Sequence, residues 1–236
     1  MSAAEPLLDT RNLRAFYGDF QALFGIDLSV DAGETVAIIG ANGAGKSTFL
    51  KSIAGLLAST PDSVRFAGQP IGALSADRIV KLGIALVPEG RRLFPSLSVE
   101  ENLRLGGYSR RPGPWSLERI YRLFPALRER RQHSGAALSG GQQQMVAIGR
   151  ALMANPQLLL CDEISLGLAP IVIKDIYQAL PSIIQEGTTT IIVEQDIGQA
   201  LAVANRVYCF QKGRVALSGN PATLSREQIT HAYFGL

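Results

Sequence analysis

Residues 35–48 read TVAIIGANGAGKST, and this stretch decides the fold class. It begins with the apolar and β-branched residues Thr35–Ile39, which are typical of a buried strand. It continues through Gly40–Thr48, which fits the pattern G-x-x-x-x-G-K-[ST], and then into the apolar segment Phe49–Leu57. A strand, a glycine-rich loop and a helix in this order predict a phosphate-binding loop.

The residue types of this loop indicate a nucleoside triphosphate as the ligand. Glycines allow successive backbone N–H groups to turn toward phosphate oxygens, and the helix N-terminus adds partial positive charge. Lys46 is expected to reach the β- and γ-phosphates, and the Ser47 hydroxyl is expected to ligate Mg²⁺. The predicted nucleotide-binding residues of the loop are Gly40, Asn42, Gly43, Ala44, Gly45, Lys46, Ser47 and Thr48.

Elsewhere, β-type segments alternate with helical patterns, which favours an α/β fold around a largely parallel sheet. Serines followed by Glu or Gln three residues later predict helix starts at Ser98 and Ser225. Besides Thr35–Ile39, the predicted strands, apolar on both faces, are Ile84–Val87, Leu158–Cys161, Thr189–Val193 and Val207–Gln211.

Two regions depart from this pattern. Leu7–Leu13 and Ala22–Val30 alternate in polarity with no helical pattern between them, which predicts an antiparallel β layer over about residues 5–35 and 62–70. Residues 97–145 are predicted to form a helical subdomain, interrupted at 109–114 by two prolines and a glycine. We expect one domain over residues 1–236: a P-loop NTPase (RecA-like) core with an N-terminal antiparallel β subdomain and an inserted helical subdomain.

The composition fits a folded protein with a core: of 236 residues, 47% are hydrophobic and only 18% charged. The net charge of +3 is too small to indicate a nucleic-acid partner. Met1–Arg14 lacks the pattern of a secretory signal, and no segment approaches the roughly 18 consecutive apolar residues of a membrane span. Cys161 and Cys209 lie in apolar segments, so we expect reduced core cysteines in an intracellular protein.

Two acidic residues, Asp162 and Glu163, follow the predicted strand Leu158–Cys161. Open α/β sheets place ligands at the carboxyl ends of their strands, so Asp162 is predicted to face the shell of a Mg²⁺ ion and Glu163 to polarise an attacking water. Acids at a strand end are often merely solvated. The phosphate loop in the same chain favours the metal interpretation.

Residues 138–144 read LSGGQQQ and precede the apolar helical stretch Met145–Met153. Ser139, Gly140 and Gly141 are predicted to form a helix N-terminus that a phosphate can approach, although an isolated S-G-G is usually an ordinary serine N-cap. The motif is not isolated. With the phosphate loop and the acidic strand in the same order and spacing, the sequence resembles the ATP-binding cassette (ABC) ATPases over essentially its whole length.

This resemblance implies a shared site, in which the phosphate loop of one cassette and the LSGGQ signature of another enclose ATP. Nucleotide contacts are then expected from Tyr17, stacked on adenine, and from Ser139, Gly140, Gly141 and Gln142 on the nucleotide of the second cassette. The resemblance gives Glu163, Lys46 and Gln195 catalytic roles and makes Ser47, Asp162 and Glu89 the metal-site residues.

Three positions depart from the usual family pattern. Glu89 replaces a glutamine, and a carboxylate there still ligates Mg²⁺ or holds a water. Gln195 replaces a histidine, so its amide can donate a hydrogen bond but cannot become cationic. Ile164 replaces a proline, for which we have no mechanistic interpretation.

Three segments, Glu89–Arg92, Ser165–Pro170 and Val193–Gln195, together resemble the shorter ATPase subunit of branched-chain amino acid importers. This implies an ATP-hydrolysing motor on the cytoplasmic face of the inner membrane. Its expected partners are a second cassette (identical or paralogous), integral-membrane permease subunits and, indirectly, a solute-binding protein, with no nucleic acid. Importers of urea or short amides, a soluble ABC protein acting on DNA or ribosomes, and a non-hydrolysing regulator are the alternatives.

Overall fold

The computed structural model describes residues 5–235, and the chain divides into two compact units. The first contains the described residues up to 79 together with those from 189 onward, and the second contains residues 80–188. An antiparallel sheet in the first unit has the order β2-β1-β4-β5. Its strands are β1 (Leu8–Tyr17), β2 (Phe20–Val30), β4 (Val64–Phe66) and β5 (Gln69–Pro70).

The alternation of buried and exposed residues along its strands explains this antiparallel sheet. Leu13 and Ala15 of β1 are fully buried, whereas Arg14 and Phe16 between and beyond them are exposed. β1 pairs antiparallel with both β2 and β4, which confirms the antiparallel pairing predicted from the sequence. The short turn η1 (Pro61–Ser63) precedes β4.

The second sheet of the first unit is built on β3 (Thr35–Ile39). It pairs in parallel with β8 (Thr189–Glu194) on one side and with β9 (Arg206–Gln211) on the other. β10 (Arg214–Gly219) adds an antiparallel edge to β9. Every residue of β3 and β8 is buried, so this sheet must be covered on both faces.

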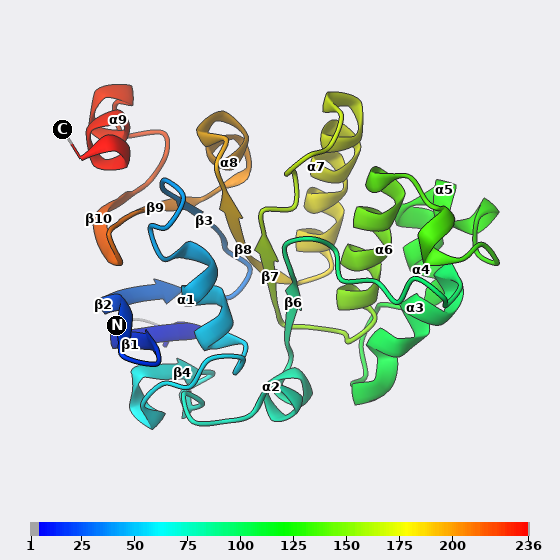
Figure 1. Ribbon diagram of the computed structural model, residues 1–236, viewed down its shortest axis with the longest axis horizontal. Helices are drawn as coiled ribbons and strands as arrows, with labels where there is room; N and C mark the ends of the chain where they lie inside the picture. Colours follow the sequence, from blue (N-terminus) through cyan, green and yellow to red (C-terminus); the bar gives the residue numbers. More distant parts are fainter. Residues whose placement is uncertain (1–4, 236) are drawn as a thin grey trace. The chain divides into compact units, whose positions relative to one another are not determined.

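Successive residues of β9 show how the two faces are covered. Cys209 packs in an apolar cluster with α8 (Ile197–Val203) and α9 (Arg226–Phe234), and Figure 1 shows α9 beside β9 and β10. Phe210 points to the opposite face, where its ring meets Phe49 of α1 (Lys46–Ile53) edge-on at 5.4 Å between centroids. Helices on both faces therefore explain the uniformly apolar strands.

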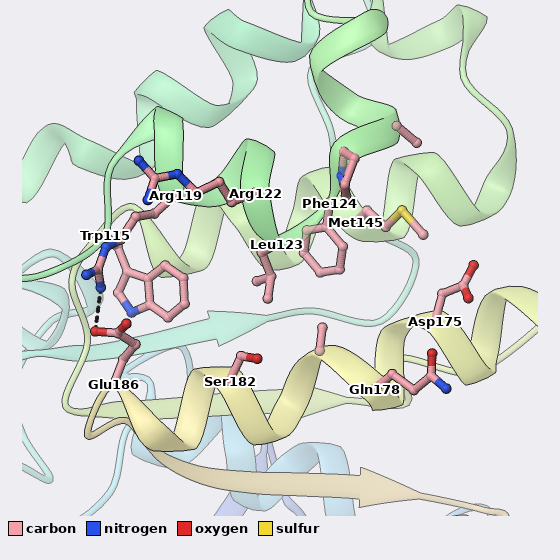
Figure 2. A pocket seen from close by; sticks show the side chains of 13 residues that line it. Trp115, Arg119, Arg122, Leu123, Phe124, Met145, Asp175, Gln178, Ser182 and Glu186 are labelled. Carbon is pink, nitrogen blue, oxygen red and sulfur yellow. Dashed lines mark ion pairs between the residues drawn. The ribbon is translucent and has the colours of Figure 1, made fainter.

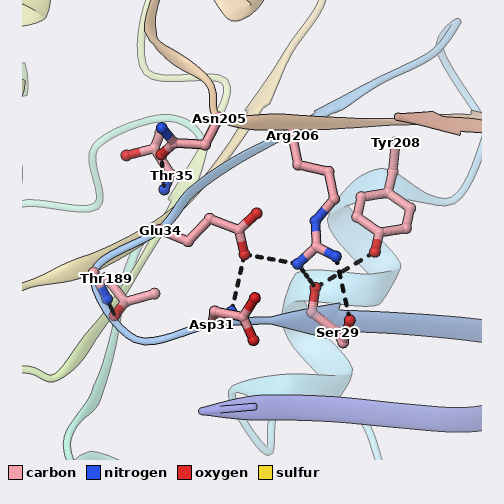
Figure 3. Close-up of polar contacts among 9 residues, drawn as sticks. Ser29, Asp31, Glu34, Thr35, Thr189, Asn205, Arg206 and Tyr208 are labelled. Atoms are coloured by element: carbon pink, nitrogen blue, oxygen red, sulfur yellow. Dashed lines mark hydrogen bonds and ion pairs between the residues drawn. The ribbon is translucent and has the colours of Figure 1, made fainter. Parts of the chain in front are cut away.

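A polar network fixes the edge at which β3 begins (Figure 3). Arg206 pairs with Glu34 at 2.7 Å between Nη2 and Oε2, and the same nitrogen donates to the carbonyl of Ser29 at 2.8 Å. The backbone N–H of Thr35 donates to the side-chain oxygen of Asn205 at 2.8 Å. These bonds tie the end of β2 and the start of β9 to the start of β3, which fixes the direction in which β3 enters the phosphate loop.

The second unit contains a parallel strand pair, β6 (Ile84–Val87) and β7 (Leu158–Asp162). Its helices α3 (Val99–Gly106) and α6 (Gly140–Leu152) pack closely because Gly149 of α6 has no side chain: a Cβ there would lie 2.7 Å from Leu103 of α3. The helical elements of this unit are α3 (Val99–Gly106), η2 (Gly107–Ser109), α4 (Leu117–Leu123), α5 (Pro125–Glu129), η3 (Gly135–Ala137), α6 (Gly140–Leu152) and α7 (Pro170–Gln185); α2 (Ala76–Leu82) spans the boundary between the units.

The sequence predicted most of the core strands. β3 and β6 have the predicted bounds, and β7, β8 and β9 are each one residue longer than predicted. Ser98 and Ser225 are confirmed as N-caps with capping boxes. Cys161 and Cys209 are both buried, and none of the helices in residues 5–235 combines the length and apolarity that a membrane span needs. β10 was not predicted.

Candidate functional site

The predicted phosphate loop joins β3 to α1 in the first unit. Gly40, Gly43 and Gly45 have φ values of +151°, +78° and +101°, and Gly45 is the N-cap of α1. A Cβ on Gly40 would lie 2.3 Å from the carbonyl oxygen of Phe210, which is backbone and cannot move aside cheaply. The loop thus has the left-handed turns and open backbone that phosphate cradling needs.

Lys46 is the first residue of α1 and is only 4% exposed. Its ammonium donates to the carbonyls of Gly40 at 2.8 Å and Ala41 at 3.3 Å, so the charge lies within the loop. On β9, where Cys209 is the register partner of Ile39, burial raises the pKa of the Cys209 thiol to about 11, an effect that the Lys46 ammonium partly opposes. Cys209 is therefore a neutral thiol at pH 7, and Lys46 supplies the positive charge.

The remaining residues of the loop, and two outside it, lie in the same unit. Asn42 and Gly43 are exposed, and Ser47 and Thr48 are half-buried. The hydroxyls of Tyr17 and Thr48 lie 3.4 Å apart, and Tyr17 remains 46% exposed. Gln195 directly follows Glu194, whose register partner is Ile39, the residue before the loop. Within the first unit, Tyr17 thus lies beside the first turn of α1, and Gln195 follows the strand end next to the phosphate loop.

The predicted acidic residues gather at one edge of the second unit. Val87 of β6 and Cys161 of β7 are register partners, so the residues that follow them leave the sheet side by side. Asp162 is only 3% exposed, whereas Glu163 is half-buried and has a left-handed backbone with φ of +48°. Glu89 is exposed on the loop after β6.

The predicted signature turn begins α6 in this unit. Ser139 is the N-cap, its hydroxyl accepts from the backbone N–H of Gln142, and the Gln142 side chain accepts from the N–H of Ser139. Gly140 and Gly141 form the first turn of the helix. A Cβ on Gly141 would lie 2.4 Å from Val172 of α7, so close packing requires glycine there. Gly140 and Gly141 add no side chains of their own to this helix N-terminus, where Val172 packs against Gly141.

One residue at this turn was not assigned a role from the sequence. Arg91 donates from Nη1 to the side-chain oxygen of Gln143 at 3.2 Å, and its guanidinium lies against Gly140. The two partners are 52 positions apart in the chain. No local signal in a single sequence announces such a contact.

A cavity of about 560 Å³ lies within the second unit, beside α4, α5 and α7 (Figure 2). The Trp115 ring points toward α7, and Arg119 forms an ion pair with Glu186 at the end of that helix. None of the predicted site residues lines this cavity, so it is separate from the residues assigned to nucleotide. It is lined by Trp115, Arg119, Arg122, Leu123, Phe124, Pro125, Ala126, Met145, Asp175, Gln178, Ala179, Ser182 and Glu186.

Comparison with known proteins gives the family. Residues 23–165 match the family described as ABC transporter. The chain is 42% identical over 232 residues to the high-affinity branched-chain amino acid transport ATP-binding protein BraG of Pseudomonas aeruginosa, covering 97% of this chain and 100% of that protein. It is 32% identical over 231 residues to the probable branched-chain amino acid transport ATP-binding protein LivF of Archaeoglobus fulgidus, covering 97% of this chain and 96% of that protein.

Solved structures agree with this result. A nucleotide-free ATP-binding cassette from an ABC transporter superposes with a TM-score of 0.83 at 27% identity, covering 97% of this chain and 95% of that one. A dimeric cassette in a post-hydrolysis state, bound to ADP and Pi, superposes with a TM-score of 0.81 at 29% identity, covering 91% of this chain and 98% of that one. The predicted fold class is confirmed. The chain belongs to the ABC transporter family, as one of its ATP-binding, ATP-hydrolysing subunits.

Proposed function

We propose that this chain drives the import of branched-chain amino acids by hydrolysing ATP. The two relatives named for branched-chain amino acid transport align over nearly the whole chain, at 42% and 32% identity. The motif segments Glu89–Arg92, Ser165–Pro170 and Val193–Gln195 support the same subfamily. The observation on which the proposal rests is the left-handed phosphate loop with Lys46 held inside it.

The phosphate loop binds the triphosphate of ATP. Backbone N–H groups of Gly43, Gly45 and their neighbours donate to phosphate oxygens, and the N-terminus of α1 adds partial positive charge. Lys46 exchanges its bonds to loop carbonyls for charge-assisted bonds to the phosphates. Tyr17, exposed beside Thr48, stacks on the adenine.

The residues assigned to metal fit Mg²⁺ by their chemistry. Ser47, Asp162 and Glu89 present only oxygen donors, which hard cations prefer. No group of three or more His, Cys, Asp or Glu side chains within residues 5–235 could hold an ion alone. Mg²⁺ takes one or two carboxylates and completes its shell with phosphate and water. When bound, the ion neutralises developing charge on the phosphates.

Glu163 acts as the general base of hydrolysis. Its carboxylate accepts a proton from the water that attacks the γ-phosphate, which raises the nucleophilicity of that water. Gln195 donates an amide hydrogen bond toward the γ-phosphate but adds no charge there. Glu89 places a carboxylate where relatives in the wider family have an amide, so this chain carries more negative charge near the phosphates.

Two cassettes complete each site. Ser139, Gly140, Gly141 and Gln142 of one cassette bind the nucleotide held by the other. Ser139 and Gly141 contact its γ-phosphate at the N-terminus of α6, whose first turn is made of glycines. ATP binding closes this dimer and hydrolysis reopens it. Membrane permease subunits receive this motion at the cytoplasmic face of the inner membrane. A solute-binding protein delivers the amino acid to the permease from the opposite side of the membrane.

The test compares Glu163→Gln with Glu129→Gln, an exposed glutamate on α5. The amide of Glu163→Gln keeps the side-chain shape but cannot accept the proton, so ATP binding should remain and hydrolysis should fall by about 10²-fold or more. Glu129→Gln should change neither. Hydrolysis at the wild-type rate in Glu163→Gln would remove this residue from the role of base.

The solute is tested on the transporter co-purified with its permease and reconstituted in liposomes. ATP-dependent uptake of labelled leucine, isoleucine or valine is the expected result. Uptake of urea or acetamide without uptake of these amino acids would overturn the assigned substrate class while leaving the ATPase assignment intact.

A further inference from the structure

Arg91 is attached to α6 at two separate points. Its guanidinium donates to the side chain of Gln143 at 3.2 Å, and its backbone carbonyl accepts from Nη2 of Arg150 at 3.1 Å. Gln143 and Arg150 are seven residues apart, so they share one face of the helix about 10 Å apart along its axis. Two attachments at this spacing fix the position of Arg91 relative to α6.

The first attachment continues into the turn that precedes the signature. Gln143 uses its oxygen to accept from Arg91, and this orients its Nε2 toward the carbonyls of Gly135 at 3.2 Å and Leu138 at 3.4 Å. An amide that loses the arginine loses the bond that sets its orientation. Arg91 therefore acts on the backbone immediately before Ser139 through a single intermediate side chain.

The second attachment holds the loop after β6. Arg150 is partly buried, and its guanidinium also lies over the ring of Phe94 at 6.0 Å. Phe94 is itself bonded at both its N–H and its carbonyl by the fully buried Asn102, at 2.9 and 3.0 Å. The segment from Glu89 to Phe94 is thus joined to the helical part of the second unit at several points, with Arg91 in its middle.

We propose that Arg91 is a positioning residue that holds the signature turn Leu138–Gln142 in register with the loop that contains Glu89, so that the two move as one body when the turn closes on nucleotide. The inference rests on the function proposed above, in which that turn completes the ATP site of a second cassette. Arg91 touches neither ATP nor water in this role; it acts through Gln143.

The adjacent residue provides a matched control. Arg91 and Arg92 both have left-handed backbones, with φ of +65° and +49°, so replacement by alanine changes backbone preference similarly at the two positions. Arg92 is exposed, and Arg91 is half-buried against α6. A difference between Arg91→Ala and Arg92→Ala therefore reports the side-chain attachment.

The experiment measures kcat and KM for ATP on the co-purified transporter, and ATP affinity on the isolated chain. Arg91→Ala should lower kcat by about tenfold with ATP affinity of the isolated chain unchanged, because the phosphate loop is untouched. Arg92→Ala should stay within about twofold of wild type. Arg91→Lys should recover only part of the loss, since an ammonium lacks the planar fork.

A double-mutant cycle separates the pathway through Gln143 from a general loss of packing. Arg91→Ala combined with Gln143→Ala should be no worse than the more damaging single variant. Equal effects of Arg91→Ala and Arg92→Ala, or full additivity with Gln143→Ala, would overturn the inference. Undiminished hydrolysis in Glu163→Gln would instead overturn the proposed function, and the two failures are therefore distinct.

Discussion

At the scale of single residues, the phosphate loop depends on where a side chain cannot be tolerated. Gly40 and Gly43 are both in the left-handed half of φ, but their surroundings differ. A Cβ on Gly40 would meet the Phe210 carbonyl at 2.3 Å, whereas nothing lies within 4 Å of a Cβ on Gly43. The motif requires glycine at position 40 and leaves position 43 unrestricted, and the folded chain shows that Gly40 also has a packing role.

This difference predicts unequal costs for Gly40→Ala and Gly43→Ala. Gly43→Ala should lose about 1 kcal/mol of unfolding free energy from left-handed strain. Gly40→Ala adds a collision with backbone and should lose roughly 3 kcal/mol or more, which lowers the unfolding midpoint by about 6–12 °C. Thermal unfolding without nucleotide is the measurement. Equal midpoints for the two variants would contradict the contact between Gly40 and β9.

Lys46 provides the second prediction at this scale. Lys46→Ala removes the charge-assisted bonds to phosphate and should weaken ATP binding by about 10- to 100-fold. Lys51→Ala, which changes an exposed lysine in the last turn of the same helix, serves as the control and should leave binding unchanged. Calorimetric titration with ATP distinguishes the two. Unaltered affinity in Lys46→Ala would contradict the assignment of the phosphate loop.

At the scale of elements, the sequence predicted those strands whose bounds are set by the residues within and next to them. β3 and β6 have the predicted bounds because every one of their residues is apolar or β-branched and lies between turn residues. β10 was missed because it is an edge strand whose residues alternate between exposed and half-buried, a weak pattern in a short segment. The attachment of Arg91 to α6 was also missed, since it depends on the fold as a whole.

The sequence predicted the N-caps of two helices correctly. The Ser98 hydroxyl accepts from the N–H of Glu101 at 3.2 Å, and the Glu101 carboxylate accepts from the Ser98 N–H at 2.8 Å. The bonds from Ser98 hold the pKa of Glu101 below its ordinary range. The folding stability that these bonds contribute is fully present above the ordinary pKa range of a glutamate and is lost as the pH falls through the lowered pKa of Glu101.

Removing this cap predicts a measurable loss of stability. Ser98→Ala should lower the unfolding free energy by about 1 kcal/mol and the midpoint by about 2–4 °C at pH 7. Ser96→Ala, an exposed serine two residues earlier, is the control and should shift the midpoint by less than about 1 °C. An identical shift for both serines would mean that the capping box does not stabilise α3.

At the scale of the whole molecule, the predicted site residues fall into two groups. Tyr17, the phosphate loop and Gln195 belong to the first unit, while Glu89, the signature turn and the acid pair belong to the second. Residue types and spacing predicted the phosphate loop and the acid pair, because those motifs are local. The family resemblance implied the roles of Tyr17, Gln195, Glu89 and the signature turn. The pairing of one cassette with another was implied by the family resemblance and stays a prediction for this chain.

The most direct test of the central claim measures ATP hydrolysis per chain against chain concentration, alone and with the co-purified second cassette, for wild type and Ser139→Arg. We predict a rate that rises with cassette concentration to a plateau and is lost in Ser139→Arg, while the affinity of the isolated chain for ATP stays the same. A rate that is independent of concentration and of the second cassette, and is unaffected by Ser139→Arg, would contradict a site completed by two cassettes.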